Sequence, residues 1–211
     1  MTILDDSKGL SENQLMTLLN FQEEYIRGFQ VLNQFNGRRR ATFYGAARVD
    51  HDAKIYQDTF KLAREMSQLG YVILNGGGPG MMGAATDGAE SVNGDTVAIT
   101  VNITQEPAQD NADKTISTTN FSVRKYMLRS SEVLICVPGG IGTLDELAEV
   151  LVLARFGKIP PKKIFLYNTE FWMFLDKWLD ETLLNKWNMN YRDYQDLFHL
   201  VDSPEEVIAL L

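Results

Sequence analysis

This chain of 211 residues contains little cysteine and histidine, and its basic residues are fewer than its acidic ones. The single cysteine, Cys136, excludes a disulfide within the chain, and its apolar surroundings indicate a small buried side chain. The two histidines, His51 and His199, lack the spacing of zinc ligands, so we expect no metal site. Lys and Arg total 20 against 28 Asp and Glu, and the resulting net charge of −8 argues against a nucleic-acid partner.

Long apolar runs are absent as well. No stretch is long enough to cross a bilayer, and the first residues show no signal-peptide pattern, so we expect no membrane partner and a cytoplasmic location. The chain also contains no G-K-[ST] phosphate loop and no G-x-S-x-G nucleophile elbow. Its apolar content of 45% is enough for one sizeable core, and a small anionic ligand remains compatible with the net charge.

The chain does contain a regular alternation of apolar β-branched runs with helical periodicity. We expect strands at 41–45, 71–74, 96–101, 114–119, 133–137 and 163–167, with helices between them. This alternation is typical of an α/β fold, a Rossmann-like doubly wound parallel sheet with helices on both faces. Ligands of such sheets bind beyond the carboxyl ends of the strands, where the strand order switches.

An N-terminal helix precedes this alternation. It begins at a capping box, Ser11 to Gln14, and ends at Gly37. We therefore divide the chain into an N-terminal helical extension, residues 1–37, and a Rossmann-like domain, residues 38–211. The extension is expected to pack on the main domain or on a second subunit.

The stretch from Val133 to Glu146 is the most informative one. An apolar run turns at Pro138-Gly139-Gly140 and continues as a helix that we expect to begin near Thr143. Free backbone N–H groups and the positive end of the helix dipole make such a turn an anion site. Thr143 and Glu146 also fit a capping box, which would explain both without function. A carboxylate beside a phosphate would be repulsive, unless it faces a sugar.

A second glycine-rich turn, Gly78-Pro-Gly-Met-Met-Gly83, matches G-x-G-x-x-G literally. It does not follow the first strand, and the next strand ends at Asn102 rather than at an acidic residue, which disfavours a dinucleotide. We favour a tight turn that binds phosphate or sugar. Close packing of helix on strand remains the alternative.

The pair Arg124-Lys125 breaks a local rule. If Ser122 caps a helix, two cations stand in its first turn and oppose the helix dipole. Such conflicts are more common at functional sites, although both side chains could instead be solvated or paired with acids. By contrast, we interpret Trp172, Trp178 and Trp187 as packing residues on helix faces.

Taken together, these motifs resemble one protein family. Pro138-Gly-Gly-Ile-Gly-Thr-Leu-Asp-Glu146 fits the P-G-G-x-G-T-x-x-E signature of the LOG ("Lonely Guy") proteins, nucleoside 5′-monophosphate phosphoribohydrolases that release cytokinin bases. Many of these proteins were once labelled lysine decarboxylases. Gly76-Gly-Gly-Pro-Gly-Met-Met-Gly83 is similar to the family's G-G-G-x-x-G-L-M-G, and the Arg-Lys pair also matches. The resemblance covers about residues 40 to 210.

The resemblance implies an enzyme without a metal or redox cofactor, which forms a homodimer or a higher homo-oligomer. Its substrate would be a cytokinin riboside 5′-monophosphate or an AMP-like nucleotide, and its catalytic pair would be Arg124 and Glu146. The implied substrate-binding residues are Gly45, Gly77, Gly78, Gly80, Met82, Gly83, Lys125, Gly139, Gly140, Ile141, Gly142 and Thr143.

Three departures leave the preferred base open, one of which is the extra N-terminal helix. Phe121-Ser122 stands where plant-type members have Met-His, and the turn Gly45-Ala-Ala-Arg48 stands where they have Gly-Ser-Ser. A non-catalytic protein that binds or senses nucleotides is the main alternative, because the same cradle would serve it without Glu146. A dinucleotide-dependent enzyme is a third hypothesis.

Overall fold

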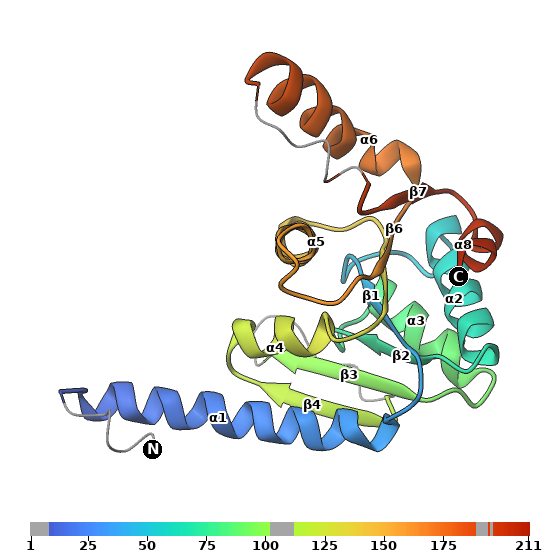
Figure 1. Ribbon diagram of the computed structural model, residues 1–211. Helices are drawn as coiled ribbons and strands as arrows, with labels where there is room; N and C mark the ends of the chain where they lie inside the picture. Colours follow the sequence, from blue (N-terminus) through green and yellow to red (C-terminus); the bar gives the residue numbers. More distant parts are fainter. Residues whose placement is uncertain (1–8, 102–111, 189–193, 195) are drawn as a thin grey trace.

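The structure, a computed structural model, describes residues 9–101, 112–188, 194 and 196–211 (Figure 1). The strands in chain order are β1 (Arg40–Tyr44), β2 (Val72–Asn75), β3 (Thr96–Val101), β4 (Lys114–Thr118), β5 (Val133–Cys136), β6 (Lys163–Tyr167) and β7 (His199–Val201). The helices are α1 (Glu12–Leu32), α2 (Lys54–Gln68), α3 (Met81–Glu90), α4 (Phe121–Leu128), α5 (Ile141–Arg155), α6 (Thr169–Lys177) and α8 (Pro204–Leu210). A short 3₁₀ turn (Asn33–Phe35) follows α1, and a π-helical segment (Trp178–Lys186) continues α6.

All strands form one seven-stranded sheet in the order β4-β3-β2-β1-β5-β6-β7, and every neighbouring pair is parallel. The predicted α/β fold is therefore confirmed. The chain runs outward from β1 through β2 and β3 to β4, and returns to the other side of β1 with β5. The strand order thus switches between β1 and β5, the place where this class of sheet binds ligands.

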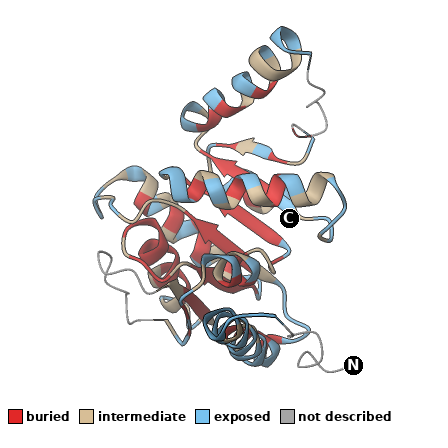
Figure 2. Ribbon diagram, turned by 90° about the vertical axis from the view of Figure 1, so that its left-hand side faces the viewer, coloured by how far each residue is buried: buried red, intermediate tan, exposed pale blue. Residues whose placement is uncertain are grey.

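Each face of the sheet is covered by its own layer of helices (Figure 1). One layer contains α1, α4, α5 and α6, and the other contains α2, α3 and α8. Alternate side chains of each strand enter opposite layers: in β5, Leu134 and Cys136 join the first core and Val133 and Ile135 the second. The five inner strands are consequently buried along most of their length, whereas the edge strands β4 and β7 are largely exposed or half-buried (Figure 2).

The N-terminal helix behaves as its sequence predicts at its start, where the Ser11–Gln14 capping box is confirmed. Its body packs against β4 and α4 (Figure 1). Among the described helices, none is both long and apolar enough to cross a membrane.

Two features of the C-terminal part differ from expectation. The edge strand β7 was not predicted, because it has only three residues and a single fully buried side chain, Val201. Trp172 is 1% exposed and its indole N–H donates to the Cys136 carbonyl, but Trp178 is 48% and Trp187 62% exposed. The prediction of Trp178 and Trp187 as packing residues was therefore wrong; they stand at the first residue and at the C-cap of the π-helical segment.

Candidate functional site

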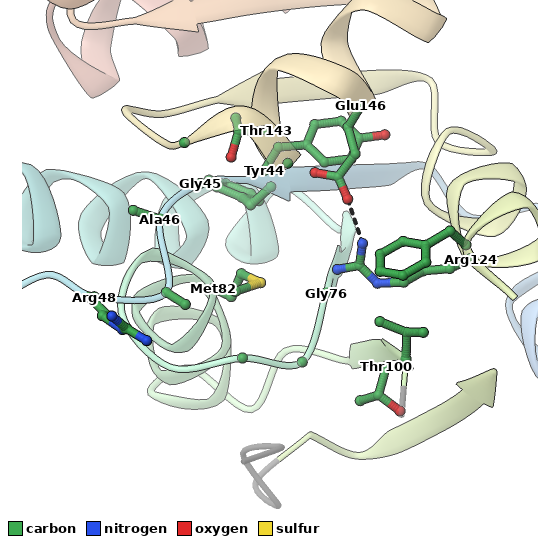
Figure 3. Close-up of a pocket in the computed structure, with 18 residues that line it drawn as sticks. Tyr44, Gly45, Ala46, Arg48, Gly76, Met82, Thr100, Arg124, Thr143 and Glu146 are labelled. Atoms are coloured by element: carbon green, nitrogen blue, oxygen red, sulfur yellow. Dashed lines mark hydrogen bonds and ion pairs between the residues drawn. The ribbon is translucent and has the colours of Figure 1, made fainter. Parts of the chain in front are cut away.

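A cavity of about 420 Å³ lies at the carboxyl ends of the central strands, where the strand order switches (Figure 3). The turns after β1, β2 and β5 all contribute to its wall, as their positions after strands predicted. The volume is in the range of small-molecule sites. Nine of the residues expected in the site line this cavity: Gly45, Gly77, Gly78, Met82, Arg124, Gly140, Gly142, Thr143 and Glu146. Five others do not line it: Gly80, Gly83, Lys125, Gly139 and Ile141.

The helix α5 presents its N-terminus to the cavity. It begins at Ile141, with Gly140 as the N-cap residue and no side-chain cap. A methyl group built on Gly140 or Gly142 would meet nothing within 4 Å, so the backbone here is open to a ligand. Unpaired N–H groups of the first helical turn and the helix dipole make this the natural position for an anion.

The start of α5 corrects one expectation. Thr143 is the third residue of the helix rather than its cap, and its buried side chain packs under Gly139, where a Cβ would lie 2.2 Å from Thr143 Oγ1. The capping box of Thr143 and Glu146 is therefore wrong. Glu146 is one turn further along the helix and is free to face the cavity.

Glu146 instead pairs with Arg124, which comes from α4 (Figure 3). Arg124 Nη1 donates to Glu146 Oε1 at 2.6 Å, and the two side chains are only 13% and 11% exposed. Burial raises the pKa of the Glu146 carboxyl above its ordinary value, although the charge and the hydrogen bond of Arg124 oppose this rise. The ion pair lies at the wall of the cavity and is largely shielded from solvent.

Gly76 lies directly under this pair. A Cβ at Gly76 would be 2.0 Å from Arg124 Nη2, so a larger residue would displace the guanidinium. The aromatic side chain of Tyr44 lies on the other side of Glu146 (Figure 3). Burial, and then the charge of Glu146, raises the pKa of Tyr44 well above its ordinary value, so its hydroxyl stays neutral.

The three turns are also bonded to one another. Met81 N–H, at the start of α3, donates to Ala46 O at 2.9 Å, and Ala46 N–H donates to Pro138 O at 3.1 Å. Gly80 has a φ of +65°, and a Cβ there would lie 2.6 Å from Ala46 O. Gly80 therefore permits the close approach of two turns, a structural role that differs from the packing of helix on strand considered for G-x-G-x-x-G.

Lys125 does not line the cavity and pairs with acids of α5. Its Nζ atom lies 3.1 Å from Asp145 and 2.8 Å from Glu149, and Arg129 Nη1 lies 2.6 Å from Glu149. Burial lowers the pKa of Lys125, but the hydrogen bonds and charges of Glu149 and Asp145 outweigh burial, so the pKa of Lys125 is raised overall. The helix begins after Asn120 rather than at Ser122, so Arg124 and Lys125 lie beyond its first turn. The expected conflict with the helix dipole was wrong.

Several cavity residues were missed from the sequence: Tyr44, Arg48, Gly76, Thr100 and Phe121. Each stands at or near the carboxyl end of a strand or the start of α4, and this position was the available signal. Among the described residues, no group of three or more His, Cys, Asp or Glu could hold a metal ion.

The family model described as "Possible lysine decarboxylase" matches residues 82–211. The chain belongs to this family. Curated relatives identify it as the LOG family. An Arabidopsis thaliana protein named as a probable cytokinin riboside 5′-monophosphate phosphoribohydrolase is 33% identical over 138 residues, 60% of this chain and 67% of that protein. A Mycobacterium tuberculosis protein named cytokinin riboside 5′-monophosphate phosphoribohydrolase is 32% identical over 108 residues, 49% of this chain and 57% of that one. The alignments span from 51% to 78% of the length of the curated relatives compared.

Solved structures confirm the fold of this LOG-family chain. The molybdenum cofactor carrier protein of Chlamydomonas reinhardtii superposes with a TM-score of 0.61 at 24% identity, over 82% of this chain and 95% of that one. The molybdenum cofactor binding protein of Rippkaea orientalis superposes with a TM-score of 0.60 at 24% identity, over 83% and 96%. At this identity the likeness concerns the fold alone.

Proposed function

We propose that this protein hydrolyses the N-glycosidic bond of nucleoside 5′-monophosphates and releases the free base and ribose 5-phosphate. The observation that carries the proposal is the buried Arg124–Glu146 pair beside an open helix N-terminus in one cavity. The first group supplies acid–base and electrostatic chemistry, and the second binds a phosphate. The names of the curated relatives support the same reaction.

In the proposed reaction the N-terminus of α5 binds the phosphate, and Arg124 and Glu146 act on the glycosidic bond. The 5′-phosphate is held by the backbone around Gly140 and Gly142, which positions the ribose toward Glu146. As the bond between the anomeric carbon and the base nitrogen breaks, the sugar becomes oxocarbenium-like, and the Glu146 carboxylate stabilises its positive charge. A water oxygen then bonds to the anomeric carbon. Glu146 takes a proton from this water, and one proton is delivered to the nitrogen of the departing base, so that one water is consumed in all. Arg124 orients the carboxylate or assists departure of the base.

The cavity defines the phosphate and ribose of the substrate more closely than it defines the base. Purine and cytokinin nucleotides share the phosphate and ribose that the cavity would bind, whereas the base would contact the exposed ring of Phe121 at the cavity lining. Phe121 replaces the Met of the plant-type pattern, so we propose that the range of accepted bases differs from that of the plant enzymes. AMP and cytokinin riboside 5′-monophosphates are the first substrates to compare.

A decarboxylase, the older family label, fits the cavity less well. Pyridoxal-dependent decarboxylases hold their cofactor through a lysine. None of the described residues that line the cavity is a lysine, and the nearby Lys125 is paired with Asp145 and Glu149 outside it.

We also propose that the protein is a homodimer or higher homo-oligomer. Exposed apolar side chains gather on one helical layer, that of α1, α4, α5 and α6, whereas the opposite layer exposes only Leu69 and Leu210 among the large apolar residues described. This unequal distribution of exposed apolar side chains supports an interface on the first layer. The exposed apolar residues on this side are Met16, Leu18, Leu19, Ile26, Phe29, Phe121, Tyr126, Ile141, Val152, Phe156, Phe171, Met173, Phe174, Trp178 and Trp187.

Base release tests the proposed reaction. Wild type, Glu146→Gln and Arg124→Ala are incubated with AMP, isopentenyladenosine monophosphate and other monophosphates, and the free bases are separated by chromatography. We expect release by wild type and its loss in both variants. Adenosine, which lacks the phosphate, is expected to be a poor substrate, and equal rates for adenosine and AMP would contradict the assigned role of α5.

A protein that binds nucleotides without turnover is the second candidate. It is favoured by one observation, namely that the open site at Gly140 and Gly142 consists of backbone at a helix N-terminus and needs no ionised side chain to bind a phosphate. Nucleotide binding by calorimetry with no base release from any member of the panel would select it. Tight binding of NAD or NADP would instead favour the dinucleotide hypothesis.

A further inference from the structure

One carboxylate of the N-terminal helix is buried away from solvent. Glu24 of α1 is 3% exposed and is the only charged side chain among the described residues that is buried to this degree. A charge in such a position is costly unless hydrogen bonds satisfy it. The partners of Glu24 therefore indicate what the helix holds.

All the partners lie at the start of α4. Glu24 Oε1 accepts hydrogen bonds from Thr119 N–H at 2.8 Å and from Thr119 Oγ1 at 2.5 Å, and Oε2 accepts one from Asn120 Nδ2 at 3.2 Å. Asn120 is the N-cap residue of α4, and its own side chain makes no capping bond. Burial raises the pKa of Glu24, but these hydrogen bonds outweigh it, so the net pKa is lowered and the group is ionised.

Further contacts join the same two helices. Tyr126 of α4 meets Tyr25 and Phe29 edge-on, with ring centroids 5.2 Å and 5.9 Å away. One turn along, Gly28 brings the backbone of α1 against the Met127 side chain, whose Cε would lie 2.5 Å from a Cβ. The extension thus contacts both the start of α4 and the side chains of Tyr126 and Met127.

The helix α4 carries Arg124. Arg124 N–H donates to Asn120 O at 3.1 Å, the first helical bond after the cap. Asn120 is consequently bonded to Glu24 through its side chain and to Arg124 through its backbone. A continuous series of bonds leads from Glu24 through Asn120 and Arg124 to Glu146.

We infer that Glu24 is a positioning residue for the cavity: through Thr119 and Asn120 it sets where α4 begins and thereby where the Arg124 guanidinium meets Glu146. The N-terminal helix is then part of the functional unit rather than an appendage. A displacement of α4 by a fraction of an ångström would lengthen the 2.6 Å bond between Arg124 and Glu146, to which catalytic rates are sensitive. The activity readout of this inference rests on the proposed function.

The test compares Glu24→Ala and Glu24→Gln with a matched control, Glu23→Gln. Glu23 is the preceding residue of the same helix and makes an exposed pair with Arg27 at 3.5 Å. Steady-state kinetics with AMP are measured together with hydrogen–deuterium exchange of peptides that cover residues 119–128. Thermal melts confirm that each variant is folded.

In Glu24→Ala we expect kcat to fall by about tenfold or more while KM changes about twofold or less, because the phosphate cradle of α5 is untouched. Exchange should accelerate within residues 119–128 and stay unchanged in α2 and α3. Glu24→Gln, which still accepts a bond from Thr119, should recover part of kcat, and Glu23→Gln should match wild type.

Unchanged exchange over residues 119–128 in folded Glu24→Ala would overturn the inference, as would an equal loss of kcat in Glu23→Gln. Failure of the proposed function is a separate result, since it shows as no base release by wild type. The exchange measurement then still decides whether Glu24 positions α4.

Discussion

The Nε atom of Arg124 lies 3.0 Å from the carbonyl oxygen of Ile99, at the same time as its Nη1 atom bonds Glu146. One planar guanidinium thus connects strand β3 to helix α5, and its orientation is set by two bonds at fixed angles. Because both bonds come from one guanidinium, we expect the site to require arginine specifically and not only a positive charge.

Arg124→Lys tests that requirement. Lysine keeps the charge but carries its donors on a single nitrogen, so it cannot serve Ile99 and Glu146 together. We expect kcat for AMP to drop by about tenfold or more while the melting temperature stays within a few degrees of wild type. The measurement is steady-state base release beside a thermal melt, and full activity of Arg124→Lys would show that charge alone is needed.

The pH dependence of activity should report the buried carboxylate. Burial raises the pKa of Glu146, and the reaction needs its ionised form, so kcat/KM should decline as pH falls through a value above that of an ordinary glutamate. Removing the opposing charge in Arg124→Ala should raise this pKa further and move the acidic limb of any residual activity to higher pH. A pH–rate profile from 4 to 9 measures both, and an acidic limb at the ordinary glutamate pKa would contradict the expectation.

Two glycines of the cavity region should respond in opposite ways to alanine. Gly142 lies in the first turn of α5 with open space beside it, so Gly142→Ala should leave stability unchanged or raised by up to about 1 kcal/mol, while the methyl group weakens phosphate binding. Gly80 combines positive φ with a close approach to Ala46 O, so Gly80→Ala should cost about 1–3 kcal/mol.

Urea unfolding and AMP titration by calorimetry measure these two effects separately. The prediction for Gly142 fails if its alanine variant binds AMP as tightly as wild type. The prediction for Gly80 fails if its variant unfolds at the wild-type urea concentration.

Self-association should depend on the apolar layer of helices. Ile26 is exposed on α1, and Ile26→Glu places a charge in that surface, so the particle mass should shift toward the 23.9 kDa of one chain. Leu69→Glu, on the opposite layer, is the matched control and should keep the wild-type mass. Sedimentation velocity at micromolar concentration makes the comparison, and a monomeric wild type would refute the interface.

Most of the fold could be predicted because it depends on local patterns. Apolar runs such as Val133–Cys136 and the alternation with helices indicate a buried parallel sheet, and the Ser11–Gln14 box marks a helix start without any tertiary information. The edge strand β7 could not be predicted in this way. Its three residues pair with β6 in the folded chain, and too few of them are buried to leave a pattern.

In the candidate site, too, local features could be predicted from the sequence, whereas contacts between separate elements could not. Glycine turns after strands predict a cavity at the carboxyl ends, because parallel strands bring these ends together. Whether Glu146 caps its own helix or faces a partner from another element is not a local property. Thr143 and Glu146 have the spacing of a capping box, yet the side chain of Thr143 is buried under Gly139 and Glu146 is bonded to Arg124 of another helix.

The sequence by itself determined the parallel sheet, the glycine turns and the residue types at the site, since hydrophobic periodicity and backbone conformational preferences act over a few neighbouring residues. Only the tertiary structure decided that Arg124 faces Glu146 while Lys125 turns to Asp145 and Glu149, and that Glu24 holds the start of α4. These pairings join residues that are 20 to 95 positions apart. Their geometry follows from how helices pack on the sheet, which no short stretch of sequence encodes.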